Sequence, residues 1–227
     1  MVEARYSRNI GAVTEEEFSL LRTRRVFLAG CGGLGGNILA HLLRIGLGAV
    51  TAVDGDVFEV SNLNRQLLSS VPVLGRSKVE EAAAYAAAVN PDVAFTGYAV
   101  FLDESNAASL IRGHDLVIDA LDNIASRRIL AAACREAEIP LIYGAIRGWT
   151  AQVSVLMPET APRALDLLYP ETARLTDKSC LSFTPALCAS LEAAEAVKLL
   201  LGKPSELDGQ LLFVDLLSNE QELIPLV

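Results

Sequence analysis

A glycine-rich segment, Gly30-Cys31-Gly32-Gly33-Leu34-Gly35, follows an apolar run and precedes a stretch with helical apolar spacing. Glycines let a backbone turn tightly and approach a phosphate, and the free N–H groups at a helix start attract anions. Asp54 ends the next apolar run, where a carboxylate can accept a hydrogen bond from a ribose hydroxyl. We therefore predict a nucleotide site that contains Gly30, Gly32, Gly33, Gly35 and Asp54. The nucleotide stays open, since NAD is the usual ligand of such a segment.

The polar stretch after Asp54 supplies groups that suit a triphosphate. These groups are charged or amide side chains. They are Asp56, Asn62, Arg65 and Gln66 in this stretch, and Lys78 at the start of the next expected helix. Cations neutralise the charge that shifts between phosphate oxygens during attack at phosphorus. A nicotinamide dehydrogenase needs a proton-transfer group instead, and the chain offers only His41 and His114 and no Tyr-x-x-x-Lys. ATP is favoured, with an NAD-binding protein as an alternative.

A second acidic segment, Asp119-Ala-Leu-Asp122-Asn123, ends another buried strand and faces the same edge of the expected sheet. A carboxylate there can hold Mg²⁺, which prefers oxygen ligands and keeps several waters. Asp122 is the candidate metal ligand, with Asn123 beside it in the site. The alternative is that Asp122 caps the helix that begins at 124.

The cysteines form no C-x-x-C pair, which disfavours a disulfide framework or a four-thiolate zinc site. Cys31, Cys134 and Cys188 are expected to be buried as small apolar side chains. Cys180 follows Lys178 in an expected loop, and a nearby cation favours the reactive thiolate. Its alternative role is a small side chain that covers the site.

The elements that position these residues alternate between strands and helices. We expect strands at 24–30, 49–54, 93–99, 115–119, 140–143 and 151–157, and helices at about 36–46, 76–89, 104–112, 124–137 and 184–201. We expect a loop at 158–183, Thr184 as the cap of the last helix, and a terminal hairpin at 210–217 and 221–226. This order predicts an α/β fold: a Rossmann-like, doubly wound, mostly parallel sheet with a C-terminal antiparallel extension. One domain, 1–227, is expected, with its nucleotide-binding part at about 24–150 and the crossover loop, helix and hairpin at about 151–227.

Composition excludes several classes of protein. The 227 residues are 52% hydrophobic and 21% charged, with a formal net charge of −9, which argues against general nucleic-acid binding. No apolar run approaches the ~18 residues that span a bilayer. The first residues lack the apolar core of a signal peptide. We expect a cytoplasmic protein that binds neither nucleic acid nor membrane.

The chain resembles the ThiF/MoeB/HesA family, relatives of the ubiquitin-activating enzymes, over about residues 5–202. The matching segments are Arg5-Tyr6-Ser-Arg8-Asn9, the glycine loop, Asp54-x-Asp56, Ser61-Asn62-Leu-Asn-Arg65-Gln66, Gly75-x-x-Lys78-Val, Asn90-Pro91, Asp119-x-x-Asp122-Asn123 and Glu195-Ala-x-Lys198-Leu. The resemblance implies an ATP-dependent adenylyltransferase that activates the C-terminal Gly-Gly of a ubiquitin-like sulfur carrier, similar to ThiS or MoaD, for thiamine, molybdopterin or related sulfur transfer. The alternative within the superfamily is a small-molecule or tRNA-borne carboxylate.

The resemblance also implies roles for single residues. Asp54 would bind the ribose, Asn62, Arg65 and Lys78 the phosphates, and Asp122 the Mg²⁺. Arg8 would reach across a homodimer into the partner's site. Cys180 matches a cysteine that forms a covalent link to the carrier in some relatives.

Two departures from the family pattern bear on zinc and on the carrier. Many bacterial members hold zinc with two C-x-x-C pairs, whereas this chain has Ala164-Leu-Asp-Leu167 near the first pair and lacks the second. Zinc is therefore expected to be absent. The crossover loop is shorter, and Ala151-Gln152 replaces a Gly-Gln pair, so carrier recognition is where we expect this protein to differ.

Overall fold

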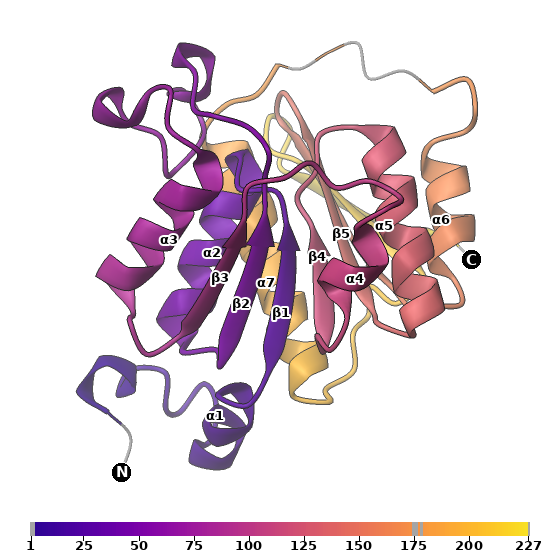
Figure 1. The fold of residues 1–227 in the computed structure, drawn as a ribbon. Helices are drawn as coiled ribbons and strands as arrows, with labels where there is room; N and C mark the ends of the chain where they lie inside the picture. The colour runs from indigo at the N-terminus through magenta and orange to yellow at the C-terminus, as the bar shows by residue number, and fades with distance from the viewer. Residues whose placement is uncertain (1–2, 174–176, 178, 227) are drawn as a thin grey trace.

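The computed structural model describes residues 3–173, 177 and 179–226. Its centre is one eight-stranded sheet with the order β3-β2-β1-β4-β5-β6-β7-β8 (Figure 1). The strands are β1 Arg25–Ala29, β2 Ala49–Val53, β3 Ala94–Tyr98, β4 Leu116–Asp119, β5 Leu141–Arg147, β6 Thr150–Leu156, β7 Gln210–Asp215 and β8 Glu220–Pro225. The first five are parallel, and β6, β7 and β8 are added antiparallel. The predicted Rossmann-like sheet with an antiparallel extension is confirmed.

Helices cover both faces of the sheet (Figure 1). On one face lie α2 Gly33–Ile45, α3 Lys78–Val89 and α7 Phe183–Leu200, and on the other α4 Ala107–Ile111, α5 Ile124–Ala137 and α6 Ala161–Leu168. Burial on both faces explains why the central strands are continuous apolar runs, since Val26 to Ala29 are all 0% exposed.

Two helices were not expected from the sequence. Helix α1, Glu15–Leu21, begins with a capping box in which Thr14 and Glu17 bond each other's backbone N–H. Helix α6 lies inside the expected loop 158–183, so that prediction was wrong. The apolar spacing of Ala161, Ala164, Leu165 and Leu168 is helical and was overlooked.

The start of α7 also differs from the prediction. The helix begins at Phe183, with Ser182 as its N-cap residue. Thr184 was expected to be the cap, but its hydroxyl instead donates to the Gly148 carbonyl at 2.8 Å. This bond fastens α7 to the turn between β5 and β6. The remaining elements lie close to their expected ranges.

The segment before β1 covers the amino-terminal edge of the sheet. Tyr6 is 1% exposed and packs on Phe18 of α1 with ring centroids 4.7 Å apart. Its hydroxyl accepts a bond of 2.7 Å from Asn90, the residue at the end of α3. The Gly48 N–H donates to Leu21 at the end of α1 just before β2 begins. Among the described residues, no helix has the length and apolar character needed to cross a bilayer.

Candidate active site

A cavity of about 290 Å³ lies at the carboxyl ends of the parallel strands. Residues that follow β1, β2 and β4 line it, namely Gly30, Asp54 and Ala120, together with Ala145 within β5. The strand order reverses between β1 and β4, and open α/β sheets bind their ligands at such a reversal. The predicted nucleotide residues are therefore brought together where the sheet geometry favours a ligand.

The glycine loop forms one wall of this cavity. Gly30, Gly32 and Gly33 line it, and α2 begins at Gly33, so unpaired N–H groups of the first helical turn lie at this wall. Gly35 was predicted as a cofactor-binding residue but lies behind the wall. A Cβ at position 35 would come within 1.9 Å of the Gly30 carbonyl oxygen. Its role in this structure is to let α2 pack directly on the end of β1.

Asp54 fixes the glycine loop against the end of β2. Its two carboxylate oxygens accept bonds of 2.8 Å from the N–H groups of Cys31 and Asp56. Burial raises the pKa of Asp54, while these N–H groups and Lys78 act in the opposite direction. Each oxygen keeps a second acceptor position, so a ribose hydroxyl can still donate to this carboxylate.

Three predicted side chains form the polar wall beside the loop. The buried Lys78 ammonium lies 3.0 Å from a carboxylate oxygen of the exposed Asp56. Arg65 donates to the Ser61 carbonyl at 2.9 Å and lines the cavity. Gln66 is buried, and its Oε1 has no hydrogen-bond partner among the described residues. Two cations and an amide thus surround the space next to the glycine loop, which suits phosphate oxygens.

Asn62 does not line the cavity, although it was predicted to bind phosphate. Its side chain is buried and its Oδ1 accepts a 3.0 Å bond from the Glu59 N–H. That bond closes the short turn Val60–Asn62. In this structure Asn62 shapes the loop that carries Arg65.

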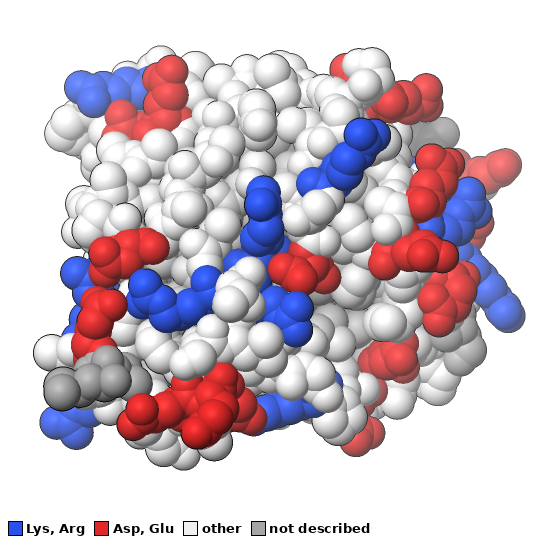
Figure 2. Space-filling view, turned by 60° about the horizontal axis from the view of Figure 1, so that its bottom comes forward, with Lys and Arg blue, Asp and Glu red and all other residues white. Residues whose placement is uncertain are grey.

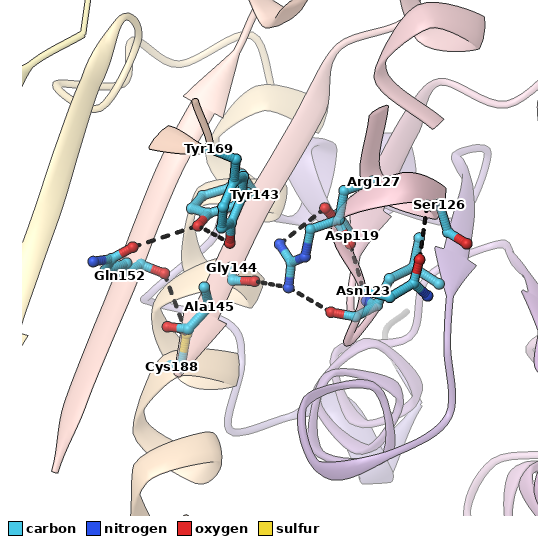
Figure 3. A network of polar contacts seen from close by, with 11 residues as sticks. Asp119, Asn123, Ser126, Arg127, Tyr143, Gly144, Ala145, Gln152, Tyr169 and Cys188 are labelled. Atoms are coloured by element: carbon cyan, nitrogen blue, oxygen red, sulfur yellow. Dashed lines mark hydrogen bonds and ion pairs between the residues drawn. The ribbon is translucent and has the colours of Figure 1, made fainter. Parts of the chain in front are cut away.

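The loop after β4 places Asp122 and Asn123 on the opposite wall. Asn123 is the cap of α5, since its Oδ1 accepts a 2.8 Å bond from the Ser126 N–H (Figure 3). The cap function considered for Asp122 therefore belongs to its neighbour. Asp122 is exposed and lines the cavity.

The cavity suits a magnesium ion shared with a nucleotide better than a protein-enclosed metal. Among the described residues, no group of three or more His, Cys, Asp or Glu side chains could hold a metal ion. Mg²⁺ commonly takes one or two carboxylates together with substrate phosphates and water. Asp122, which lines the same cavity as Arg65 and Lys78, fits that arrangement.

Several residues that line the cavity were not singled out from the sequence. They are Phe101, Arg127, Arg147 and Tyr169. Tyr169 comes from the end of α6 and its hydroxyl lies 2.7 Å from that of Tyr143 on β5 (Figure 3). The sequence offered one signal for Arg127, which is its place on α5 shortly after the acidic segment that contains Asp119 and Asp122. A buried arginine needs a buried acid as its partner, and Asp119 is that acid.

Cys180 lies in the cavity wall, half-buried, and Asn64 donates to its carbonyl at 3.1 Å. Burial raises the pKa of its thiol, and the nearby Arg65 lowers it by a smaller amount. Lys178, which we expected to favour the thiolate, lies outside the described residues. Cys31, Cys134 and Cys188 are buried, as predicted.

Arg8 lies far from this cavity within its own chain. It is an exposed residue of the segment that covers the amino-terminal edge of the sheet, whereas the cavity lies at the carboxyl-terminal edge. Figure 2 brings forward the amino-terminal edge of the sheet, where Lys and Arg side chains lie among Asp and Glu side chains. The residues near this edge form ion pairs, among them Arg24–Asp115 at 3.1 Å and Lys203–Glu17 at 2.8 Å.

Comparisons with known proteins agree with this geometry. The model of the ThiF family matches residues 6–226. The chain is 37% identical over 227 residues to the SAMP-activating enzyme E1 of Haloferax volcanii, covering 97% of this chain and 84% of that protein. It is 35% identical over 199 residues to the molybdopterin-synthase adenylyltransferase of Escherichia coli, covering 86% of this chain and 80% of that protein. Its fold matches the crystal structure of E. coli MccB with ATP, with a TM-score of 0.85 at 19% identity, covering 100% and 72% of the two chains.

Proposed function

The chain belongs to the ThiF family and is an ATP-dependent adenylyltransferase, and we propose that it activates the C-terminal Gly-Gly carboxylate of a ubiquitin-like sulfur carrier. The observation that carries the proposal is that the glycine loop, Asp54, Arg65 and Lys78 line the same cavity. Those groups match a nucleotide triphosphate rather than a nicotinamide, for which the wall provides no histidine.

In the proposed reaction, a carboxylate oxygen of the carrier attacks the α-phosphorus of ATP. An acyl–phosphate bond forms, the bond to the β-phosphate oxygen breaks, and pyrophosphate leaves with its electron pair. Asp54 orients the ribose, and the glycine loop with Arg65 and Lys78 stabilises the charge that develops on the phosphate oxygens. Asp122 would hold Mg²⁺, which would supply positive charge that offsets the charge on the phosphate oxygens.

The carrier's tail would enter between the end of β5 and residues 179–180. Ala145, Ile146 and Arg147 line the cavity from β5, while Ser179 and Cys180 line it from the other side. The Gly148 N–H donates to the Ser179 carbonyl at 2.8 Å, which ties the two sides together beside the cavity. A tail of two glycines, with no side chains, suits an approach that is bounded by backbone on both sides.

The proposal extends to the assembly and the pathway. We propose a homodimer in which Arg8 of one subunit serves the site of the other, because Arg8 cannot reach its own cavity from the opposite edge of the sheet. Among the sulfur-transfer pathways, the name of the E. coli relative favours molybdopterin synthesis over thiamine synthesis.

The test is exchange of labelled pyrophosphate into ATP in the presence of a Gly-Gly-ended carrier. Exchange should require the carrier, and a carrier that lacks its two terminal glycines should give none. Exchange with a small carboxylic acid or with a tRNA-borne carboxylate, but with no carrier, would contradict the carrier proposal and keep the adenylation chemistry. Tighter binding of NAD than of Mg-ATP in calorimetry would contradict the assignment of the nucleotide.

A further inference from the structure

Glu192 of α7 is a buried acid without a charged partner or a backbone N–H donor among the described residues. Its side chain is 0% exposed, and both carboxyl oxygens lack a partner among the described residues. The carboxyl group lies directly against the backbone of β5, since a Cβ at Gly144 would come within 2.2 Å of Glu192 Oε1. A buried ionised carboxylate in that setting would be strongly unfavourable, so the position of Glu192 requires an explanation.

Arg127, the cation that acts on Glu192, already donates hydrogen bonds to three other acceptors (Figure 3). Arg127 Nη1 donates to Asp119 at 3.0 Å, and Nη2 donates to the carbonyls of Leu121 and Gly144. Asp119 ends β4, Leu121 adjoins Asp122 in the cavity wall, and Gly144 lies in β5. One guanidinium therefore links the two strands to the loop that carries Asp122.

The charges in this region decide which acid carries a proton. Burial raises the pKa of Asp119 too, but the Arg127 guanidinium at 3.0 Å and the Leu121 N–H at 2.9 Å oppose that rise and favour its carboxylate. Glu192 has neither kind of contact. Burial raises the pKa of Glu192 well above its usual range and the Asp119 charge raises it further, while Arg127 and the Cys188 thiol only partly oppose them. Glu192 is therefore the neutral acid of the group.

The other elements packed against α7 supply little additional charge to Glu192. These elements are α2, β4, β5 and β6. Strand β6 contains no ionisable residue, and His41 of α2 contacts Ser190, which is exposed on another face of α7. Tyr143 of β5 stacks on Arg127, with the guanidinium carbon 5.0 Å from the ring centroid. On α7 itself, Cys188 and Glu195 are the ionisable residues about one turn from Glu192, and Cys188 is the one that acts on its pKa.

We propose that Arg127 is a positioning residue that fixes the cavity wall bearing Asp122, and that it does so while Glu192 holds a proton. An ionised Glu192 would compete with Asp119 for the one buried guanidinium and would draw it from the two carbonyls that hold the wall. The inference rests on the proposed function through the role of Asp122 with Mg-ATP. The protonation of Glu192 is independent of that role.

The first experiment follows the thermal stability of E192Q and wild type against pH. A carboxyl group whose pKa is raised in the folded state makes the fold lose stability as pH rises above its unfolded pKa, ordinarily 4.5. Glu192→Gln removes that loss, so its Tm should exceed that of wild type by a margin that grows from pH 5 to pH 8. Glu195→Gln is the matched control, because Glu195 is buried one turn further along α7 but is bonded to Lys198 and Ser205. A Tm of E192Q below that of wild type, with the largest deficit at neutral pH, would mean an ionised Glu192 and would overturn the proposal.

The second experiment measures ATP affinity by calorimetry with magnesium and with EDTA. In wild type, magnesium should strengthen binding. Arg127→Lys should lose that gain by about tenfold or more, as loss of an outer partner of a metal site typically does, and should keep its affinity in EDTA. Arg128→Lys is the control, since its side chain contacts Asp166 and Tyr169 of the α6 region rather than the loop after β4. Asp122→Asn should lose the same gain as R127K.

The outcomes separate the inference from the proposed function. If D122N loses the magnesium gain and R127K keeps it, Arg127 does not position the wall and the inference is overturned. If wild type shows no magnesium gain, the role of Asp122 fails, while the pH experiment still decides the state of Glu192. If R127K does not fold, E192Q decides, because a neutral amide must keep the magnesium gain within about twofold. Loss of the gain in E192Q would overturn the proposal.

Discussion

At the scale of single residues, the surroundings of Lys78 and of Cys180 in the cavity affect the two side chains differently. Lys78 is buried at the polar wall, where its ammonium lies 3.0 Å from a carboxylate oxygen of Asp56. Among the described residues, Arg65 is the cation that favours the Cys180 thiolate, and burial outweighs its effect on the pKa. We therefore expect Lys78 to dominate nucleotide affinity and Cys180 to be a slow nucleophile at neutral pH.

Lys78→Met should weaken Mg-ATP binding by about ten- to hundredfold, because it removes a charge-assisted contact to phosphate. Calorimetry with purified protein measures this directly. Lys203→Met is the control, since Lys203 pairs with Glu17 at the other end of the molecule and should leave the affinity unchanged. Equal effects of the two variants would exclude a local role for Lys78.

Alkylation should label Cys180 and spare the three buried cysteines. Because burial raises the pKa of the Cys180 thiol, the rate with iodoacetamide should be low at pH 7 and should still be rising at pH 9. Arg65→Gln should slow the reaction, since the cation that favours the thiolate is lost. The rate comes from peptide mass spectrometry, with C180S as the blank, and a rate that is already maximal at pH 7 would contradict the expected shift.

At the scale of elements, the junction between β1 and α2 decides where the phosphate wall stands. Gly30 has a φ of +101°, which glycine adopts readily, and its carbonyl lies directly under Gly35. Asp54 ties the same loop to the end of β2. The loop is thus fixed from two sides before a ligand binds.

Gly35→Ala should destabilise the protein by about 1–3 kcal/mol, as overpacking of a tight contact commonly does, and should weaken ATP binding as α2 is displaced. Gly33→Ala is the matched change two residues earlier, where a Cβ would meet Pro185 at an ordinary 3.6 Å. G33A should stay within about 1 kcal/mol of wild type, since alanine favours a helix more than glycine. Urea unfolding of both variants provides the comparison, and similar losses would contradict the backbone clash.

The elements also show where sequence patterns were sufficient and where they were not. The strands and helices around the glycine loop follow from local spacing, because a buried parallel strand is a continuous apolar run. Helix α6 was missed since proline and polar residues surround it, although Arg128 fastens it to α5 through Asp166 and the Tyr169 carbonyl. The contact of Arg128 with Asp166 and Tyr169 joins residues far apart in the chain, so no local sequence pattern predicts this contact.

At the scale of the whole molecule, the two edges of the sheet separate two predicted site residues. Lys78 lies at the cavity, and Arg8 lies on the segment that covers the opposite edge. Catalysis that needs both would require a second subunit whose amino-terminal segment meets the cavity of the first. The proposed homodimer can therefore be tested without a structure of the assembly.

R8A and K78M should each be inactive in pyrophosphate exchange with the carrier. When they are mixed and allowed to reassort, half of the dimers are mixed, and each mixed dimer has one intact site. Activity should return to about a quarter of wild type, as expected for two-fold dimers with shared sites. Mixed proteins that stay inactive after verified subunit exchange would contradict a role for Arg8 in the partner's site.

The sequence by itself indicated the strands, most of the helices and most of the residues that line the cavity, because glycine spacing, strand-end acids and helix starts are local features. It also indicated Asp54, Arg65, Lys78 and Asp122 before their positions were known. Only the tertiary structure decided that Asn62 supports a turn behind the cavity and that Arg8 lies at the opposite edge. It also brought Asp119 of β4 and Glu192 of α7 close to the Arg127 guanidinium of α5. The reason is physical: burial and charge balance in that group depend on how β4, α5 and α7 pack together, and packing between distant segments leaves no local pattern in the chain.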